Sequence, residues 1–577
     1  MRLMKSKRHL GLTLHALLTA GCVTPGPEES VVGDYLSGRL AARTNDVVAA
    51  ADAFGDAQTE VPGASKILRD AFFFQLASGN FEDAMPLAEK ISTDPEEGDD
   101  GLAKLVIAAR EVKFGRYQAA RNALEGGGEA AYFSATEKIL DAWALSALKG
   151  PNAAAQLLSI AGENEFKGFD PLHMALFAEQ AGRPDAAYAA HQLSVVTYGG
   201  TVGRSAYGAF LERSGETDAA REYYELLSQD AGSDRQTARQ GLARLDANEV
   251  SQAFANVTPA QGAAIAFYTL GGAILQQTSN QRAAAERAGF NVNDVNYNLP
   301  LVLTQLALYV DPSFDDARRF AGSILNAYGN YDQANVILSE ITPASPYYEL
   351  ARIEIAAGLA AQEQDEEAIS VLRNALRRDP DALELRLSLA NLLASRERYD
   401  DAVKVVDALV TRLPDEVETD AWRYFVARGS YLLELDDWPG AEKDLQRAVE
   451  IAPEEPTALN YLGYSWAERS LNLDEAFGLI EKAVSLQPDS GAIIDSLGWA
   501  HYQLGEYEKS VGHLEQAAAL APDDPTVTEH LGDVYWRLGR TREARYQWRR
   551  ALELEPSDKQ STIINEKITD GLSDAAQ

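Results

Sequence analysis

The chain of 577 residues contains a single cysteine, Cys22. An intramolecular disulfide and a metal site built from several cysteines are therefore both excluded. Basic residues are also few, because 52 lysines and arginines stand against 87 aspartates and glutamates, for a net charge of −35. Binding to nucleic-acid phosphates requires a cationic surface, so we expect no nucleic-acid partner.

The sequence lacks the common catalytic motifs: it has no Walker A loop, no HExxH and no GxSxG. The run from Ser146 to Lys149 fits SxxK but has no partner motif, which favours coincidence. His501, His513 and His530 fall at unlike repeat positions without a carboxylate pair, so we expect surface or interface histidines rather than a metal site. We expect no catalytic residue, no metal, no cofactor and no enzymatic activity.

The first residues have the order of a bacterial signal peptide. A basic start, residues 1–9, precedes an apolar stretch at 10–20, which is too short to cross a bilayer as a stable helix. The run LTAGC, ending at Cys22, resembles the lipobox of bacterial lipoproteins. The alternative is a chance cysteine near an ordinary signal peptide. Thr19 and His15 depart from the usual lipobox pattern.

The lipobox resemblance implies that residues 1–21 are a signal peptide and that Cys22 carries a lipid. Residues 22–33, rich in Pro, Gly and Glu, then form a lipidated tether. We therefore expect a protein of the cell envelope, anchored to a membrane through its N-terminal lipid. The expected location is the outer membrane, facing the periplasm.

Residues 315–558 repeat with a period of 34. A column of small residues comprises Gly322, Ala356, Ala390, Gly429, Gly463, Gly498 and Gly532. A second column, 12 or 13 residues later, comprises Ala334, Ala368, Ala402, Ala441, Ala476, Ser510 and Ala544. A third column follows at Ile341, Ala375, Leu409, Ala448, Ala483, Ala517 and Ala551, and each unit then has a proline five residues further. Each unit predicts two amphipathic helices, with small residues at their contact and a proline that ends the second.

A single such hairpin cannot bury its apolar face, whereas stacked hairpins can. The pattern resembles the tetratricopeptide repeat (TPR) family. The resemblance implies an all-α fold, a right-handed solenoid of stacked antiparallel hairpins. We expect divergent TPR-like repeats over 34–240, a degenerate repeat over 241–314 with an inserted loop at 279–298, seven clear repeats over 315–558, and a C-terminal helix and tail at 559–577. The run Thr258–Gln261 predicts a helix start with a capping box.

In TPR arrays the first helix of each hairpin lines a concave groove. Reading the inward positions of the last three repeats gives candidate partner-binding residues in which aromatic and acidic side chains lie together: Asn460, Tyr464, Asp495, Trp499, Tyr502, Glu529, Asp533 and Trp536. We expect the aromatic side chains to anchor a partner and the carboxylates to select cationic or polar groups.

The mature chain also resembles the long TPR lipoproteins of Gram-negative bacteria, one type of which is the adaptor of a periplasmic C-terminal-processing protease. The resemblance implies a membrane-anchored scaffold or adaptor whose partners are proteins or peptides of the cell envelope. A component that handles glycans, in exopolysaccharide, cell-wall or outer-membrane assembly, is the alternative, because the same aromatic residues would stack on sugars. Neither the partner nor the oligomeric state follows from the sequence.

Overall fold

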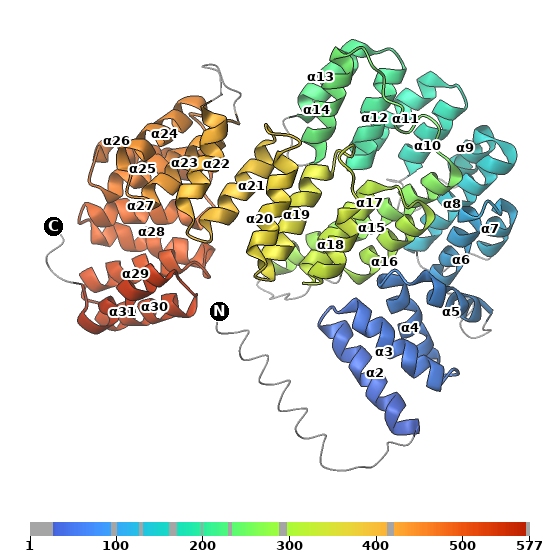
Figure 1. Ribbon diagram of the computed structural model, residues 1–577, viewed down its shortest axis with the longest axis horizontal. Helices are drawn as coiled ribbons and strands as arrows, with labels where there is room; N and C mark the ends of the chain where they lie inside the picture. Colours follow the sequence, from blue (N-terminus) through green and yellow to red (C-terminus); the bar gives the residue numbers. More distant parts are fainter. Residues whose placement is uncertain are drawn as a thin grey trace. The chain divides into compact units, whose positions relative to one another are not determined.

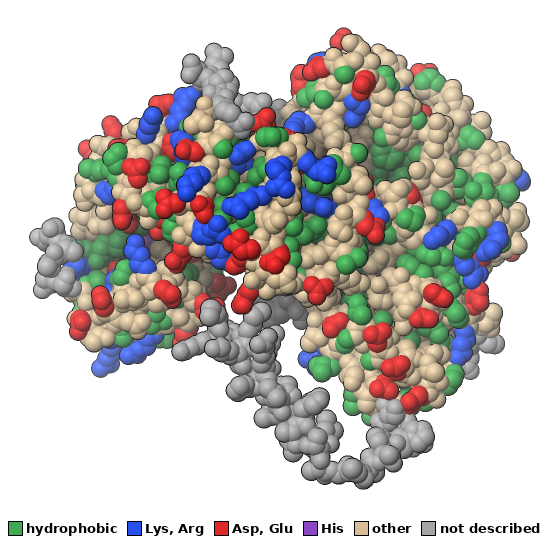
Figure 2. All heavy atoms as spheres, viewed as in Figure 1, with side chains coloured by type: hydrophobic (Ala, Val, Ile, Leu, Met, Phe, Trp, Pro, Cys, Tyr) green, Lys and Arg blue, Asp and Glu red, His purple; other side chains and the backbone are tan. Residues whose placement is uncertain are grey.

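The computed structural model describes residues 27–93, 101–125, 131–160, 170–197, 200–228, 233–287, 297–411 and 420–572. The signal peptide expected at residues 1–21 and Cys22 lie outside these ranges. The tether expected at 22–33 is corrected in part, because a helix begins at Pro27 and continues to Arg43. Within the described ranges the chain forms thirty helices and no strand, which confirms the predicted all-α repeat fold (Figure 1). No helix in these ranges is both long enough and apolar enough to cross a membrane. Acidic and basic side chains are interspersed on the face shown in Figure 2.

The chain divides into two compact units, an N-terminal unit (Met1–Ala368) and a C-terminal unit (Ile369–Gln577). The N-terminal unit begins with thirteen short helices, α2–α14. Their bounds are α2 (Pro27–Arg43), α3 (Val47–Glu60), α4 (Ser65–Ala77), α5 (Phe81–Thr93), α6 (Gly101–Lys113), α7 (Tyr117–Ala123), α8 (Ala131–Lys149), α9 (Pro151–Ile160), α10 (Asp170–Gln180), α11 (Pro184–Thr197), α12 (Thr201–Arg213), α13 (Thr217–Leu227) and α14 (Ser233–Asp246).

Two further helices, α15 (Pro259–Arg287) and α16 (Asn298–Val310), precede the regular repeats. The remaining helices form seven hairpins and a final single helix. Their bounds are α17 (Asp315–Ala327), α18 (Tyr331–Ser339), α19 (Tyr348–Ala361), α20 (Asp365–Leu376), α21 (Leu383–Ala394), α22 (Tyr399–Val410), α23 (Trp422–Glu434), α24 (Trp438–Ile451), α25 (Pro456–Glu468), α26 (Leu473–Leu486), α27 (Gly491–Gln503), α28 (Tyr507–Leu520), α29 (Pro525–Arg537), α30 (Thr541–Glu553) and α31 (Asp558–Asp570).

The small-residue columns lie where the two helices of a hairpin touch. A Cβ atom added to Gly463 would lie 2.7 Å from Cγ1 of Ile480, and one added to Gly532 would lie 2.5 Å from Cδ1 of Trp548. In the second column Ser510 replaces alanine, and its hydroxyl donates to the carbonyl oxygen of Gly498 at 2.7 Å. The hairpin contacts therefore leave no room for a larger side chain.

Helices α15 and α16 pack across the first helices of earlier hairpins: α15 lies against α6 and α8, and α16 against α4 and α6. A Cβ atom on Gly262 would lie 2.0 Å from Cε2 of Trp143, so α15 approaches α8 closely. Tyr309 of α16 stacks on Phe81, with ring centroids 4.3 Å apart. Helices α15 and α16 thus cover part of the surface formed by the first helices α4, α6 and α8 of the N-terminal repeats.

The region from 251 to 310 also corrects one expectation. The inserted loop was expected at 279–298, but α15 continues to Arg287, and residues 288–296 lie outside the described ranges. The alanine-rich run at 283–285 favours helix, and it outweighs the polar residues around it. The capping box is confirmed, because the backbone N–H of Thr258 donates to Gln261 and the backbone N–H of Gln261 donates to the Thr258 hydroxyl.

The glycine column makes a stability prediction. Gly463→Ala should lower the free energy of unfolding of the C-terminal unit by about 1–3 kcal/mol, because the added methyl group overpacks the hairpin contact. Gly478, on α26 of the same hairpin, is a matched control, since a Cβ atom there would meet nothing within 4 Å. Gly478→Ala should raise the free energy of unfolding by up to about 1 kcal/mol through helix propensity. Chemical denaturation measures both, and equal effects would contradict the contact role of this column.

Candidate interaction face of the C-terminal repeats

The eight predicted partner-binding residues lie on α25, α27 and α29, the first helices of three consecutive hairpins. Helix α27 packs against both α25 and α29, so these side chains form one continuous surface, which we call the aromatic–acidic face. Its members differ in exposure, however. Asp495, Glu529 and Asp533 are buried, while Tyr464, Trp499, Tyr502 and Trp536 are partly buried.

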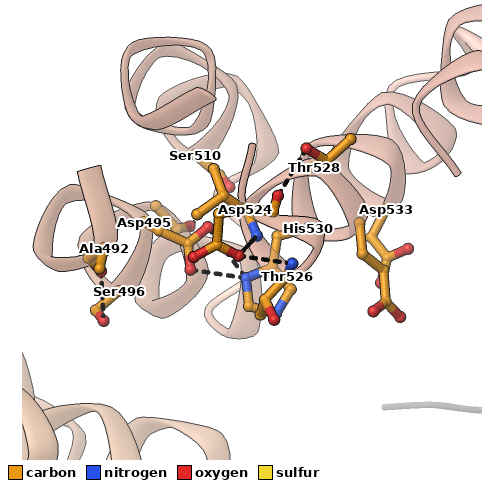
Figure 3. A network of polar contacts seen from close by, with 12 residues as sticks. Ala492, Asp495, Ser496, Ser510, Asp524, Thr526, Thr528, His530 and Asp533 are labelled. Carbon is orange, nitrogen blue, oxygen red and sulfur yellow. Dashed lines mark hydrogen bonds and ion pairs between the residues drawn. The ribbon is translucent and has the colours of Figure 1, made fainter. Parts of the chain in front are cut away.

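A buried ion pair joins α27 to α29. Nδ1 of His530 lies 2.8 Å from Oδ2 of Asp495, and Figure 3 shows the carboxylate and the ring pointing toward each other. Burial lowers the pKa of His530, but the Asp495 carboxylate and the nearby carboxylates of Asp533 and Glu529 raise it by more, so that the net pKa lies above its ordinary value. The imidazolium form is therefore favoured inside the repeat interface.

Trp499 stacks on this pair. Its ring centroid lies 3.9 Å from that of His530, with an interplanar angle of 16°. It also lies 4.6 Å from the ring centroid of Tyr502, with an angle of 7°. Nε of Arg537 donates to the Tyr502 hydroxyl at 3.2 Å. Trp499 thus supports the α27–α29 contact as well as contributing to the face, since stacking on a cationic ring is attractive.

The acidic residues of α29 are not free, and this corrects the expectation that they would select a partner's cation. Nζ of Lys567, on α31, lies 2.6 Å from Oε1 of Glu529 and 2.7 Å from Oδ2 of Asp533. Nε1 of Trp548 donates to Oδ1 of Asp533 at 2.8 Å. Asp495 is likewise occupied by His530. Buried carboxylates require such partners, because an unpaired buried charge is costly.

The signal for this pairing was present in the sequence. Lys567 lies 34 residues after Asp533, so it occupies the same repeat position in α31. The final helix therefore acts as the first helix of a further unit and covers the end of the array. Trp536 is part of this end contact, because a Cβ atom on Gly571 would lie 2.1 Å from Cζ2 of its ring.

Two polar atoms on the face have no hydrogen-bond partner among the described residues. They are Oδ1 of Asn460 on α25 and Nε1 of Trp499 on α27, and both are buried. Next to them, burial raises the pKa of Tyr464, and the carboxylates of Glu468, Asp495 and Glu529 raise it further, so its hydroxyl remains a donor. This part of the face therefore presents an unpaired acceptor and an unpaired donor on adjacent helices.

The three C-terminal histidines do not converge. His501 stacks on His513 with ring centroids 5.4 Å apart, and its Nδ1 lies 2.7 Å from Oε2 of Glu506. His530 pairs with Asp495 instead. Within the described ranges, no cluster of three histidine, cysteine or acidic residues is placed to hold a metal ion.

A cavity in the N-terminal unit was missed by sequence reasoning. It has a volume of about 480 Å³ and lies between residues 252–257 and the segments at 311–316 and 345–347. Asp316 lines it and accepts a hydrogen bond from the Tyr347 hydroxyl. Burial raises the pKa of Asp316 to about 6, although Tyr347 and Arg319 lower it. Its lining comes from segments far apart in sequence, so no local pattern marks it.

The His530 pair makes a pH prediction. A folded-state pKa above the unfolded value means that the pair stabilises fully below about pH 6.5 and loses this contribution as the pH rises through the folded pKa. Asp495→Asn should lower the pKa of His530, measured by NMR titration of its ring. His513 is the control: burial and then His501 lower its pKa, and Asp495 is not among the causes. An unchanged His530 pKa in the variant would contradict the pairing.

Comparisons with known proteins agree with the repeat geometry. Family models described as tetratricopeptide repeat match residues 359–428, 426–491 and 496–559. A TPR repeat-containing protein of Pseudomonas aeruginosa is 44% identical over 71 residues, which cover 12% of each chain. The chain thus matches only a small part of that relative.

Solved structures align along the chain at low identity. A chain of the APC/C hetero-tetramer Cut9–Hcn1 is 15% identical, with coverage of 94% of this chain and 96% of that chain and a TM-score of 0.37. A thermophilic TPR protein of Thermus thermophilus is 22% identical, with coverage of 32% and 98% and a TM-score of 0.29. Tetratricopeptide repeats are typical of protein–protein interaction scaffolds, and residues 359–491 and 496–559 of this chain are tetratricopeptide repeats.

Proposed function

We propose that the protein is a lipid-anchored, non-enzymatic scaffold of the bacterial cell envelope that binds protein partners on the aromatic–acidic face. The observation that carries the proposal is the pair of unpaired buried atoms, Oδ1 of Asn460 and Nε1 of Trp499. Each unpaired buried polar group costs about 1–3 kcal/mol in the free chain. Both atoms belong to side chains that are themselves partly exposed, so a small outward shift of Asn460 and Trp499 would let the N–H and C=O of a partner's peptide group bond them and recover this free energy.

The N-terminal repeats support the same assignment by exclusion. Helices α15 and α16 already cover α4, α6 and α8, so a partner would have to displace them from these first helices. On the C-terminal face, Tyr464 and Trp499 remain partly exposed, and aromatic side chains supply large contact area at low entropic cost. We therefore place the main binding activity on α25 and α27.

The partners we propose are proteins or peptides of the cell envelope. The basic start, the short apolar stretch and the LTAGC run support anchoring through Cys22, with the protein at the outer membrane and facing the periplasm. The resemblance to long TPR lipoproteins suggests a more specific role, namely presenting substrates to a periplasmic protease or to cell-wall machinery.

Glycan handling is the weaker candidate. A sugar would stack on an open aromatic face, whereas the Trp499 ring already stacks on His530 and Tyr502. Isolated glycan strands should therefore bind much more weakly than protein partners. Binding to glycan strands that is retained in Trp499→Phe and lost in Trp499→Ala would favour this alternative.

Partner capture tests the proposed face. Asn460→Leu removes the unpaired acceptor at nearly constant volume, so it should raise the free energy of unfolding by about 1 kcal/mol while weakening partner capture about tenfold or more. The readouts are chemical denaturation and quantitative mass spectrometry of proteins retained from envelope extract. A periplasmic protease among the retained proteins would support the adaptor role.

Gln446→Leu is the matched control, because Gln446 is exposed on α24, away from this face. It should leave the retained proteins unchanged. Equal capture by Asn460→Leu and the unsubstituted protein would contradict the assignment to α25.

Anchoring is tested separately. Cys22→Ser removes the sulfur that would carry the lipid, so the protein should stay unprocessed or leave the membrane fraction if another peptidase cleaves it. Stable anchoring requires two or more acyl chains, and mass spectrometry of the N-terminal peptide would detect them. An unsubstituted protein that fractionates as soluble, with no lipid on this peptide, would refute the proposal.

A further inference from the structure

The first helix of the array has an exposed apolar stripe. On α2 the side chains of Val32, Leu36 and Leu40 are 58%, 60% and 64% exposed. Three large apolar side chains at four-residue spacing lie on one side of a helix, since each residue turns the helix by about 100°. Scattered exposed leucines need no explanation, but a continuous stripe marks an interaction surface.

The stripe is not part of the repeat core. The core side of α2 is defined by Gly38 and Tyr35, which both meet Phe54 of α3: a Cβ atom on Gly38 would lie 2.8 Å from that ring, and the Tyr35 ring centroid lies 5.7 Å from it. By helical geometry, Leu36 and Leu40 project roughly 100° or more away from both residues, whereas Val32, at the edge of the stripe, lies about 60° from Tyr35 and about 120° from Gly38. The stripe therefore faces away from the hairpin contact.

Two arginines share the exposed side. Arg39 and Arg43 are both exposed, and their spacing from Val32 places them within roughly 20° of it around the helix. The three acidic residues of α2, Glu28, Glu29 and Asp34, all lie in its first half, so its second half combines apolar residues with arginines as its only charged residues. That is the composition of helices that lie in the headgroup region of a bilayer, where apolar side chains enter the acyl boundary and cations meet lipid phosphates. A chain with a net charge of −35 has no general attraction to such a surface.

We propose that α2 docks on the membrane surface, with Val32, Leu36 and Leu40 at the acyl boundary and Arg39 and Arg43 at the lipid phosphates. This inference rests on the proposed anchoring at Cys22. Cys22 and Pro27 are five residues apart, a span of at most about 18 Å. A lipid on Cys22 would hold α2 within reach of the headgroups. Docking of α2 would then be an intramolecular step at high effective concentration, after the lipid has inserted into the membrane.

The first experiment measures the depth of α2 directly. In the natural lipidated chain, Gly33→Cys introduces a labelling site beside the stripe, where a Cβ atom meets nothing within 4 Å. A fluorophore there, on vesicles of phosphatidylethanolamine and phosphatidylglycerol, should be quenched about twofold or more by nitroxides on the acyl chains. The same label at Gln156→Cys, exposed on α9, should be quenched little.

The stripe itself is tested by substitution. Leu36→Ser with Leu40→Ser should abolish the quenching of the Gly33 label, while the protein stays with the vesicles through its lipid. Leu193→Ser with Leu226→Ser is the matched control, because these leucines are 52% and 64% exposed on α11 and α13. The control should leave the quenching unchanged, and circular dichroism checks that both variants fold.

A second arm separates docking from anchoring. The chain from residue 23, tethered by a six-histidine tag to nickel-chelating lipid, places α2 at the membrane whether or not Cys22 is lipidated. Quenching in this arm without flotation of the natural chain would refute anchoring and retain docking. Flotation without quenching, or quenching unaffected by the leucine substitutions, would overturn docking. If the protein is a dimer that the leucine substitutions dissociate, the stripe is the interface with a second copy of the chain, and membrane docking is overturned as well.

Discussion

Close contact between the two helices of each hairpin is the constraint on which the repeats depend. Gly463 and Gly532 leave space only for a hydrogen atom where the facing helix approaches. The third-column alanines Ala483, Ala517 and Ala551 are fully buried. With the backbones this close, large side chains are directed toward neighbouring hairpins, where they form the continuous cores that a single hairpin cannot build.

The same spacing determines which side chains can serve a partner. Trp499 and Asp533 each lie one position after the small-residue column and project toward the first helix of the next hairpin. Whether they can contact a partner therefore depends on which side chains that helix places against them. At α29 the next helix is α31, and Lys567 neutralises the carboxylates. At α27 the next first helix is α29, and its His530 stacks on Trp499. Farther from the end of the array, Asn460 and Trp499 keep unpaired polar atoms.

Much of the fold could be predicted because its determinants are local and periodic. The small columns, the prolines and the capping box at Thr258 each act within one unit. The site was harder to predict, because its state depends on partners in other units. The carboxylates of Glu529 and Asp533 were identified at the right positions, but their pairing required extending the period to Lys567. The packing of α15 on α8 rests on a contact between Gly262 and Trp143, which no pattern within either helix indicates.

The central claim is that partners bind on α25 and α27 and leave the N-terminal repeats as they are. Hydrogen–deuterium exchange on the full lipidated chain, with and without a captured partner, tests it most directly. The account predicts that exchange slows over residues 456–468 and 491–503 when the partner binds, with little change over residues 27–246. Slowed exchange confined to α2–α14, or faster exchange over α15 and α16 as they leave the first helices, would contradict it.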